Sequence, residues 1–380
     1  MQARRTLARA TATALTAAAA LAWAPHAAPA AEPPQYRADQ IGQREPADIA
    51  LAPGAAQTVA HPEAAFIKVR FDRVELGPQD TLTVASPDGT ESYVYGASDV
   101  EDGGLWALSI EGESAAVRLD DAEDGTAATA HIAEYSRGLN EAELASRPGA
   151  AREESICGRD DSLHAVCYQE TDPAAYGASR SAARLLIGGE SYCTGWIAGN
   201  DRLMTNNHCF NSSAKARVTE VQFGYECISC AGGTIRTPVK VSGAEVLVTD
   251  WDLDFTLFTV SEPERIAHLP ALEVSATPVG LYDKIFIPEH PGGGPLRIAS
   301  ASSSEPAGLG SNCMVGDVRR SGRAPGTDFA YRCDTEGGSS GSPVISRATG
   351  QVVGIHHFGG CPNQAVRMDL IHPLIAPYLN

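Results

Sequence analysis

Three separated segments of the sequence carry side chains that could share one hydrolytic mechanism. His208 follows an apolar segment, Asp254 opens another, and Ser340 lies in the small-residue turn 337–343. A serine hydroxyl is a weak nucleophile, so it needs an imidazole to take its proton and a carboxylate to orient that imidazole. The glycines of the turn let the N–H groups of Gly338 and Ser340 converge on a developing oxyanion. The order His, Asp, Ser therefore predicts acyl transfer, with His208 as general base, Asp254 as orienting acid and Ser340 as nucleophile.

Two other assignments of these groups stay open. Asp252 lies two residues before Asp254 on the same face of a strand and is a second candidate for the acid. The turn also fits the Gly-x-Ser-x-Gly elbow of α/β-hydrolases, with Ser339 as nucleophile. That fold requires its acid and histidine after the serine, where Asp369 and His372 are available, and it requires alternating strands and helices, which the sequence lacks.

The N-terminal residues 1–31 are typical of a secretory signal peptide. Arg4, Arg5 and Arg9 form a basic start, and an alanine-rich apolar run follows over 10–24. The alternative is a transmembrane helix, but the run is shorter than the roughly 20 residues that a bilayer requires. We therefore expect an extracellular protein with no membrane partner.

Charge and cysteine content divide the rest of the chain near residue 150. Residues 32–150 hold 22 acidic and 8 basic residues and no cysteine, whereas 151–380 hold 25 acidic and 18 basic residues and all nine cysteines. A formal net charge of −18 argues against nucleic acid as a partner, because phosphate binding needs clustered cations. Cysteines in an exported chain are disulfide-bonded by default, and an odd number leaves at least one thiol.

Alternating apolar and polar residues predict an all-β protein. Apolar and polar residues alternate in segments 65–69, 80–84 and 105–110, and turn signals separate these segments. This pattern favours a small β-sandwich for residues 32–150. Residues 138–151 are typical of a linker. The same β pattern continues through residues 151–380, and helical periodicity is confined to the final segment, 370–379.

The three chemical segments resemble those of the chymotrypsin-fold serine endopeptidases, and especially the bacterial lysyl and glutamyl endopeptidases. The resemblance covers roughly 155–375 and rests on Cys193-Thr194-Gly195-Trp196, on Cys209 beside the histidine, and on the segments 254–257, 338–344 and 353–360. It implies two packed β-barrels over 151–380, with His208, Asp254 and Ser340 in the cleft between them. It also implies protein or peptide substrates and no metal or cofactor, and we expect a monomer.

The same resemblance implies a set of disulfides. It suggests Cys157 with Cys361, Cys167 with Cys230 and Cys193 with Cys209. Cys313 and Cys333 would then pair by elimination, which leaves Cys227 as the free thiol. A disulfide between Cys227 and Cys230, or a zinc site on that pair, is the competing interpretation.

Three residues bear on the specificity pocket, and they disagree. Asp334 stands six residues before the nucleophile, where trypsin-like relatives carry the acid that binds Lys or Arg. Thr335 and His356 stand where glutamyl endopeptidases bind an acidic side chain, whereas the acid of lysyl endopeptidases beyond the final cysteine is missing. We expect cleavage after Lys or Arg, with glutamyl specificity as the alternative.

The N-terminal segment leaves two functional alternatives. The resemblance implies that residues 32–150 are a propeptide of a zymogen, removed at a site such as Arg152-Glu153, or else a retained accessory domain. Ser339 directly precedes the nucleophile, where many animal members carry an aspartate for activation, so that route is not available. A non-enzymatic alternative is a secreted binding protein on a protease-like scaffold.

Overall fold

The computed structural model describes residues 40–379 apart from 123–126, 148–155, 200 and 307. The chain divides into Met1–Gln35 and a compact unit, Tyr36–Asn380, which holds all of the described residues. The expected signal peptide and the expected processing point at Arg152-Glu153 lie outside the described residues.

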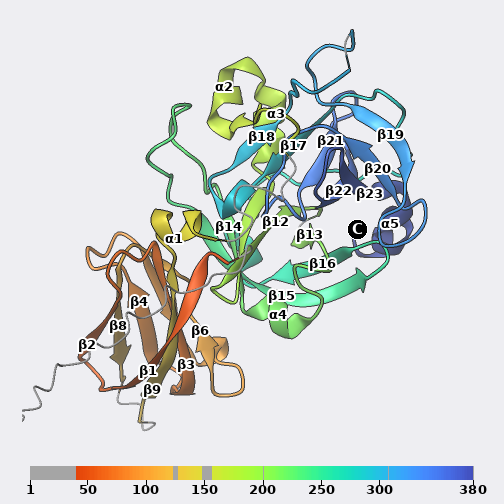
Figure 1. The fold of residues 1–380 in the computed structure, drawn as a ribbon. Coiled ribbons are helices and arrows are strands. Elements are labelled where there is room, and N and C mark those ends of the chain that lie inside the picture. The colour runs from red at the N-terminus through yellow and green to blue at the C-terminus, as the bar shows by residue number, and fades with distance from the viewer. Residues whose placement is uncertain (1–39, 123–126, 148–155, 200, 307, 380) are drawn as a thin grey trace, which may run out of the picture. The chain divides into compact units, whose positions relative to one another are not determined.

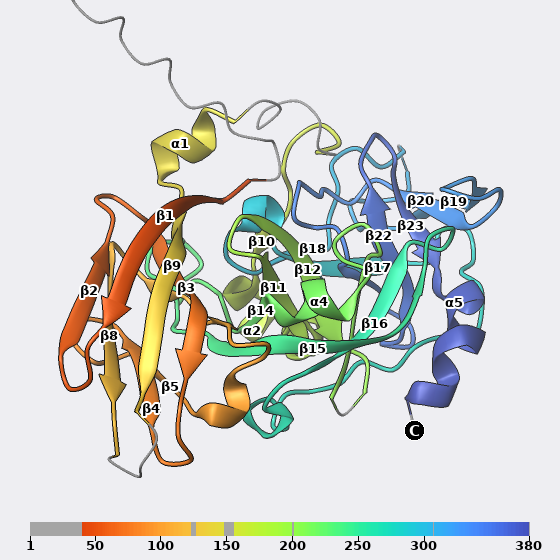
Figure 2. The ribbon, with the colours of Figure 1, turned by 90° about the horizontal axis from the view of Figure 1, so that it is seen from below.

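Two antiparallel sheets form the N-terminal part of this unit and enclose their own core. Strands in the order β1-β9-β3-β6 make one sheet, with β7 beside β3, and β2-β8-β4-β5 make the other. Figure 2 shows β1, β9 and β3 side by side. Side chains that alternate between the faces, such as Val69, Phe71, Val84 and Val117, are buried between the sheets. The predicted sandwich is therefore confirmed. Its strands are β1 Gly42–Leu51, β2 Ala56–Ala60, β3 Phe66–Glu75, β4 Thr81–Ala85, β5 Ser92–Tyr95, β6 Leu105–Trp106, β7 Ile110–Glu111, β8 Ser114–Asp120 and β9 Thr129–Gly138.

Six strands of the following segment close into a barrel. Its order is β11-β12-β13-β16-β15-β14, and its interior is filled by apolar side chains such as Leu185, Leu203, Val221 and Phe258. Figure 1 shows these strands in green. The strands are β11 Ala182–Ile187, β12 Ser191–Ile197, β13 Arg202–Thr205, β14 Thr219–Phe223, β15 Val239–Asp250 and β16 Phe255–Val260.

Eight strands make the second sheet of the C-terminal half, in the order β10-β18-β17-β21-β22-β23-β20-β19. Isolated bridges from Lys284 to Met314 and from Ala301 to Asn312 connect the β17–β18 side to the segment before β19. These bridges curl the sheet toward a second barrel, in agreement with the predicted fold class. The strands are β10 Leu163–His164, β17 Ile285–Glu289, β18 Arg297–Ala299, β19 Val315–Arg320, β20 Asp328–Tyr331, β21 Pro343–Ser346, β22 Val352–Phe358 and β23 Asn363–Arg367.

The helices of the described residues are short, as the β patterns predicted. The expected C-terminal helix is present as α5, with a 3₁₀ turn after it. Among the described residues, no helix combines the length and the hydropathy that crossing a bilayer requires. The α-helices are α1 Glu141–Ala145, α2 Tyr168–Thr171, α3 Pro173–Ser179, α4 Ser213–Arg217 and α5 Met368–Ile375, and the 3₁₀ helices are Ala97–Asp99, Ala165–Cys167, Pro263–Arg265, Pro291–Gly293 and Ala376–Tyr378.

A buried ionic cluster joins the sandwich to the first barrel within this unit. Glu220 on β14 accepts from Nζ of Lys68 on β3 at 3.0 Å and from the backbone N–H of Ser109 at 2.8 Å. Lys240 on β15 pairs with Glu91 at 2.8 Å and Glu111 at 3.0 Å. The side chains of Lys68, Glu220 and Lys240 are almost completely excluded from solvent. A charged side chain that is buried away from water needs an oppositely charged or hydrogen-bonding partner. The sandwich and the first barrel supply such partners to each other.

Candidate active site

The side chains of His208 and Asp254 meet at the end of the first barrel. Nδ1 of His208 lies 2.8 Å from Oδ2 of Asp254, and the backbone N–H of His208 donates to Oδ1 at 3.0 Å. The side chain of Asp254 is completely buried, whereas that of His208 is 33% exposed. The carboxylate therefore orients an imidazole whose far edge is open to a substrate.

Neighbouring strands bring these two residues together. Strand β13 pairs with β16, so Thr205 faces Thr256 across the ladder. His208 lies just beyond the end of β13, and Asp254 lies just before the start of β16. Asn206 Nδ2 donates to the backbone oxygen of Asp254 at 2.8 Å. Asp254 also has a φ of 42°, a left-handed conformation in which Asp is tolerated better than most residues.

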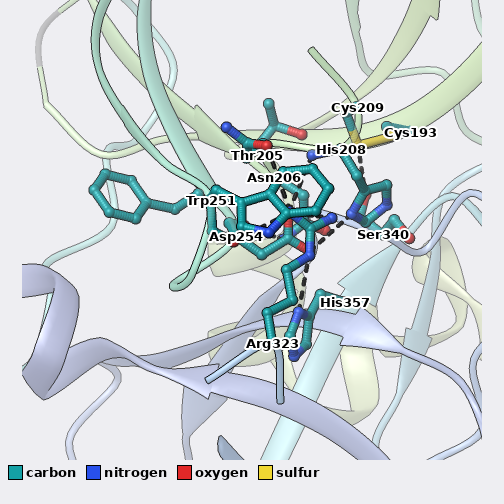
Figure 3. Close-up of polar contacts among 12 residues, drawn as sticks. Cys193, Thr205, Asn206, His208, Cys209, Trp251, Asp254, Arg323, Ser340 and His357 are labelled. Carbon is teal, nitrogen blue, oxygen red and sulfur yellow. Dashed lines mark hydrogen bonds and ion pairs between the residues drawn. A yellow bond between two sulfur atoms is a disulfide. The ribbon is translucent and has the colours of Figure 1, made fainter. Parts of the chain in front are cut away.

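The turn that carries Ser340 packs against strand β12. The backbone N–H of Thr194 donates to the carbonyl of Ser340 at 2.8 Å, and the disulfide between Cys193 and Cys209 lies beside it. Figure 3 places Ser340 next to the imidazole of His208. Gly341 has a φ of 92°, and a Cβ there would lie 2.1 Å from the carbonyl oxygen of Thr194, so only glycine allows this approach.

The backbone around the nucleophile leaves two amides available. The carbonyl of Gly337 accepts from the N–H of Gly292 at 2.6 Å. Because C=O and N–H point in opposite directions across a trans peptide, the N–H of Gly338 points away from Gly292. In the part of the chain that the structure describes, the N–H groups of Gly338 and Ser340 donate to no acceptor. Two free donors in one turn are what an oxyanion hole requires.

Asp254 has two further partners that the sequence did not reveal. Nδ1 of His357 lies 3.0 Å from its Oδ2, and Nη2 of Arg323 lies 3.2 Å from its Oδ1 (Figure 3). Burial alone would raise the pKa of this carboxyl, but hydrogen bonds from His208 and His357 outweigh it and lower the pKa to about 2. Arg323 also stacks on the indole of Trp251, 3.9 Å from the ring centroid. The repeated histidine His356-His357 was the one sequence signal for this contact.

The contacts of Asp334 weigh against its predicted role as the acid of the specificity pocket. Its Oδ1 accepts from the backbone N–H of Cys157 at 2.8 Å, and its Oδ2 accepts from that of Asp161 at 2.8 Å. The residue is 1% exposed, and burial raises its pKa to about 6 in spite of these two donors. Both carboxylate oxygens thus hold the segment after Cys157, because backbone donors occupy them in place of a basic substrate side chain.

Thr335 and His356 are both buried beside this turn. Among the described residues, the hydroxyl of Thr335 has no hydrogen-bond partner. Nδ1 of His356 lies 2.7 Å from the hydroxyl of Tyr331, and burial lowers the pKa of this imidazole to about 3. The imidazole is therefore neutral near pH 7 in the free protein, rather than the imidazolium that glutamate recognition would use.

The competing catalytic assignments do not fit the geometry. Asp252 is exposed, whereas Asp254 is the acid that contacts the histidine. Ser339, the nucleophile of the α/β-hydrolase alternative, is fully buried, and its Oγ accepts from the backbone N–H of Glu336 at 3.1 Å. Asp369, the acid of that alternative, is paired with Arg367 at 2.5 Å.

Three disulfides join pairs that the resemblance implied, and a fourth is not formed. The bonds are Cys157–Cys361, Cys167–Cys230 and Cys193–Cys209. Cys313 and Cys333 are instead buried free thiols, which corrects the prediction of a bond between them. The Cys313 thiol has its own acceptor, the carbonyl of Ala301 at 3.4 Å. Cys227 is also a buried free thiol, and its competing partner Cys230 is already bonded.

In the part of the chain that the structure describes, the cysteines beside His208 are bonded to each other. Among the described residues, one group of three side chains of metal-ligating type comes together, formed by Cys193, His208 and Cys209. The two sulfur atoms are joined in a disulfide, so they are not the thiolates that a metal would need.

Comparisons with known proteins find similarity to peptidases and to a secreted effector. Residues 193–355 match the family model of the trypsin-like peptidase domain. Secreted RxLR effector protein 73 of Plasmopara viticola is 31% identical over 332 residues, which cover 83% of this chain and 80% of that protein. A glutamyl endopeptidase of Staphylococcus epidermidis is 27% identical over 197 residues, which cover 50% of this chain and 62% of that enzyme, less than two-thirds of its length. A solved structure of a Glu endopeptidase in complex with MPD has a TM-score of 0.42 and 18% identity, and the alignment covers 59% of this chain and 98% of that chain.

Proposed function

Because this chain belongs to the trypsin-like serine peptidases, we propose that it is a serine endopeptidase that hydrolyses peptide bonds in protein or peptide substrates. The observation that carries the proposal is the 2.8 Å contact between Nδ1 of His208 and buried Asp254, beside the turn of Ser340. An oriented imidazole next to a serine is the arrangement that nucleophilic acyl transfer needs.

In the proposed mechanism, Oγ of Ser340 attacks the carbonyl carbon of the scissile bond and its proton passes to Nε2 of His208. Asp254 accepts from Nδ1 and stabilises the resulting imidazolium, while the amides of Gly338 and Ser340 bind the oxyanion. The imidazolium then protonates the leaving amine, the C–N bond breaks, and an acyl-enzyme ester remains. Water, deprotonated by the same imidazole, attacks the ester and releases the acid and the serine hydroxyl.

An alkyl fluorophosphonate probe tests the proposal without knowledge of the substrate. The full chain should be phosphonylated, and Ser340→Ala should abolish the labelling, whereas Ser339→Ala should retain it because Ser339 is buried. A protein that is folded but never labelled would instead support the second candidate, a catalytically silent binding protein. That candidate is favoured by the relative that is named an effector.

For specificity, the contacts of Asp334 weaken the expectation of cleavage after Lys or Arg. Thr335 supports cleavage after Glu, because its buried hydroxyl has no partner among the described residues and could donate to a substrate carboxylate. Digestion of a denatured protein followed by sequencing of the product termini distinguishes the two. Product ends in Lys or Arg would support the original expectation, and ends in Glu would support the alternative.

We further propose that the sandwich is a retained accessory domain and that the protein is exported. The buried cluster of Lys68, Glu220 and Lys240 resembles a permanent interface more than a removable one. Three disulfides are typical of an oxidising compartment. A specific cleavage site placed within 148–155 of the Ser340→Ala protein tests retention. The two fragments should co-elute in gel filtration after the cut, whereas their separation would indicate a releasable propeptide.

A further inference from the structure

A second histidine and a second carboxylate extend the contacts of Asp254 into the second sheet. His357 on β22 is completely buried between two acids. Its Nδ1 lies 3.0 Å from Oδ2 of Asp254, and its Nε2 lies 2.7 Å from Oδ2 of Asp328 on β20. Asp328 is itself fully buried, and its Oδ1 accepts from the hydroxyl of Thr327 at 2.8 Å.

The two contacts of His357 constrain its protonation state. A neutral imidazole carries a single N–H, so one ring nitrogen would turn its lone pair toward a carboxylate. An imidazolium donates to both acids and satisfies both contacts. It also balances charge, because a neutral ring would leave two buried carboxylates, Asp254 and Asp328, with Arg323 as the cation paired with Asp254.

The loop between β19 and β20 covers these two carboxylates. A Cβ at Gly322 would lie 2.2 Å from Oδ1 of Asp328, so the backbone passes directly over that acid. The next residue, Arg323, reaches Oδ1 of Asp254, and its Nη1 donates to the carbonyl of Trp251 at 3.1 Å. Asp254 therefore accepts on Oδ2 from two imidazoles and on Oδ1 from the amide of His208, and its Oδ1 also forms an ion pair with the guanidinium of Arg323.

From this geometry we propose that His357, held as an imidazolium by Asp328, is a positioning residue that fixes the carboxylate of Asp254 toward His208. The proposal rests on the proposed function of that triad. Three hydrogen bonds and one ion pair hold the carboxylate in one orientation, and this offsets the strain of the positive φ at Asp254. The fixed charge of His357 also offsets part of the negative charge that Asp254 presents to His208.

The titratable and charged groups around His357 include Arg323, in the loop between β19 and β20, and four residues from other elements. Asp254 precedes β16, Asp328 lies on β20, His356 is its neighbour on β22, and His208 follows β13. Burial lowers the pKa of His357, but the hydrogen bonds to Asp254 and Asp328 outweigh it, so the pKa is raised. His356 stays neutral because its burial has no such compensation.

Nuclear magnetic resonance tests the charge of His357 without any need for activity. In Ser340→Ala protein with ¹⁵N-labelled histidines, one ring should keep both nitrogens protonated at about pH 8, where an unperturbed imidazole is neutral. This signal should disappear in His357→Gln, which assigns it, and should become that of a neutral ring in Asp328→Asn. A neutral His357 in the parent protein, or an unchanged imidazolium in Asp328→Asn, overturns the proposal.

The rate of fluorophosphonate labelling against pH tests the effect on His208. Removal of the positive charge in His357→Gln should move the acid limb to higher pH by about one unit, because the imidazolium of His208 then faces a less compensated carboxylate. Asp328→Asn should move the acid limb less. It removes the negative charge of Asp328 and, because His357 then becomes neutral, the positive charge of His357 as well. Asp317→Asn, at a half-buried acid on β19, is the control and should match the parent. Slower labelling with an unmoved limb would indicate a merely structural role.

The two readouts separate the proposal from the proposed function. If the parent protein is never labelled, the endopeptidase hypothesis fails, yet the protonation state of His357 can still be measured. If labelling occurs and the ring of His357 is neutral, only the positioning role fails.

Discussion

Nζ of Lys68 on β3 lies 3.0 Å from Oε2 of Glu220 on β14, and neither side chain is open to solvent. Glu220 also accepts from Ser109 and Gln222, so every oxygen of this buried carboxylate is occupied. Groups of the sandwich, Lys68 and Ser109, thus take the place of water around the carboxylate of Glu220. The stability of the two parts is consequently coupled through Glu220.

Glu220→Gln should destabilise the protein by about 3–5 kcal/mol, because it leaves Lys68 and Lys240 buried without their shared counter-charge. Burial would raise the pKa of Glu220, but the two lysines outweigh it and lower the pKa to about 2. A lowered folded-state pKa stabilises the fold above the unfolded pKa, near 4.3 for glutamate, and this contribution of about 3 kcal/mol is lost as the pH falls to about 2.

Urea unfolding of the Ser340→Ala protein at a series of pH values checks this expectation. The acid loss of stability should be smaller in the Glu220→Gln protein, whereas Glu245→Gln, at an exposed site on β15, should behave like the parent. Equal acid sensitivity in both variants would contradict the role of Glu220.

Asp334→Asn should leave the cleavage specificity unchanged, because the carboxylate binds the amides of Cys157 and Asp161. An asparagine side chain offers one acceptor oxygen, so one of the two N–H groups loses its partner. Hydrogen exchange at Cys157 or Asp161 should therefore become faster. A switch of the residue before the cleaved bond, found by sequencing product termini, would restore Asp334 to the pocket.

Three cysteines should react with an alkylating reagent in denaturant without reduction. The structure leaves Cys227, Cys313 and Cys333 as thiols, and all three are buried in the native fold. Native protein should consequently resist the reagent, and mass spectrometry of the denatured protein should find three modified sites. Modification at Cys227 alone would mean that Cys313 and Cys333 are bonded.

Gly338→Ala should slow fluorophosphonate labelling by about a hundredfold or more, the cost of losing one oxyanion donor. A Cβ at this position would lie 2.3 Å from the ring of Tyr192 and 2.6 Å from the carbonyl of His290, so the turn must shift. Gly350→Ala is the matched control, since Gly350 also has a positive φ, 73°, but has open space around it. Equal labelling rates in the two variants would exclude Gly338 from the oxyanion hole.

The sequence by itself determined the β architecture and the identity of the catalytic candidates. Alternating patterns are local, and the segments around His208, Asp254 and Ser340 each have a recognisable composition. The pairing of Cys193 with Cys209 followed from the same short-range resemblance. These features depend on residues that are close together in the chain or in one pair of strands. They can therefore be recognised from the sequence alone.

Only the tertiary structure decided how the remaining polar groups are used. Asp334 has the position of a pocket acid in the sequence, yet its two oxygens are taken by amides 177 and 173 residues away. His357 meets Asp254 across 103 residues, and Lys68 meets Glu220 across 152. The physical reason is that a buried charge is stabilised by whichever donors or acceptors the fold brings within about 3 Å, and the chain order does not record which ones these are.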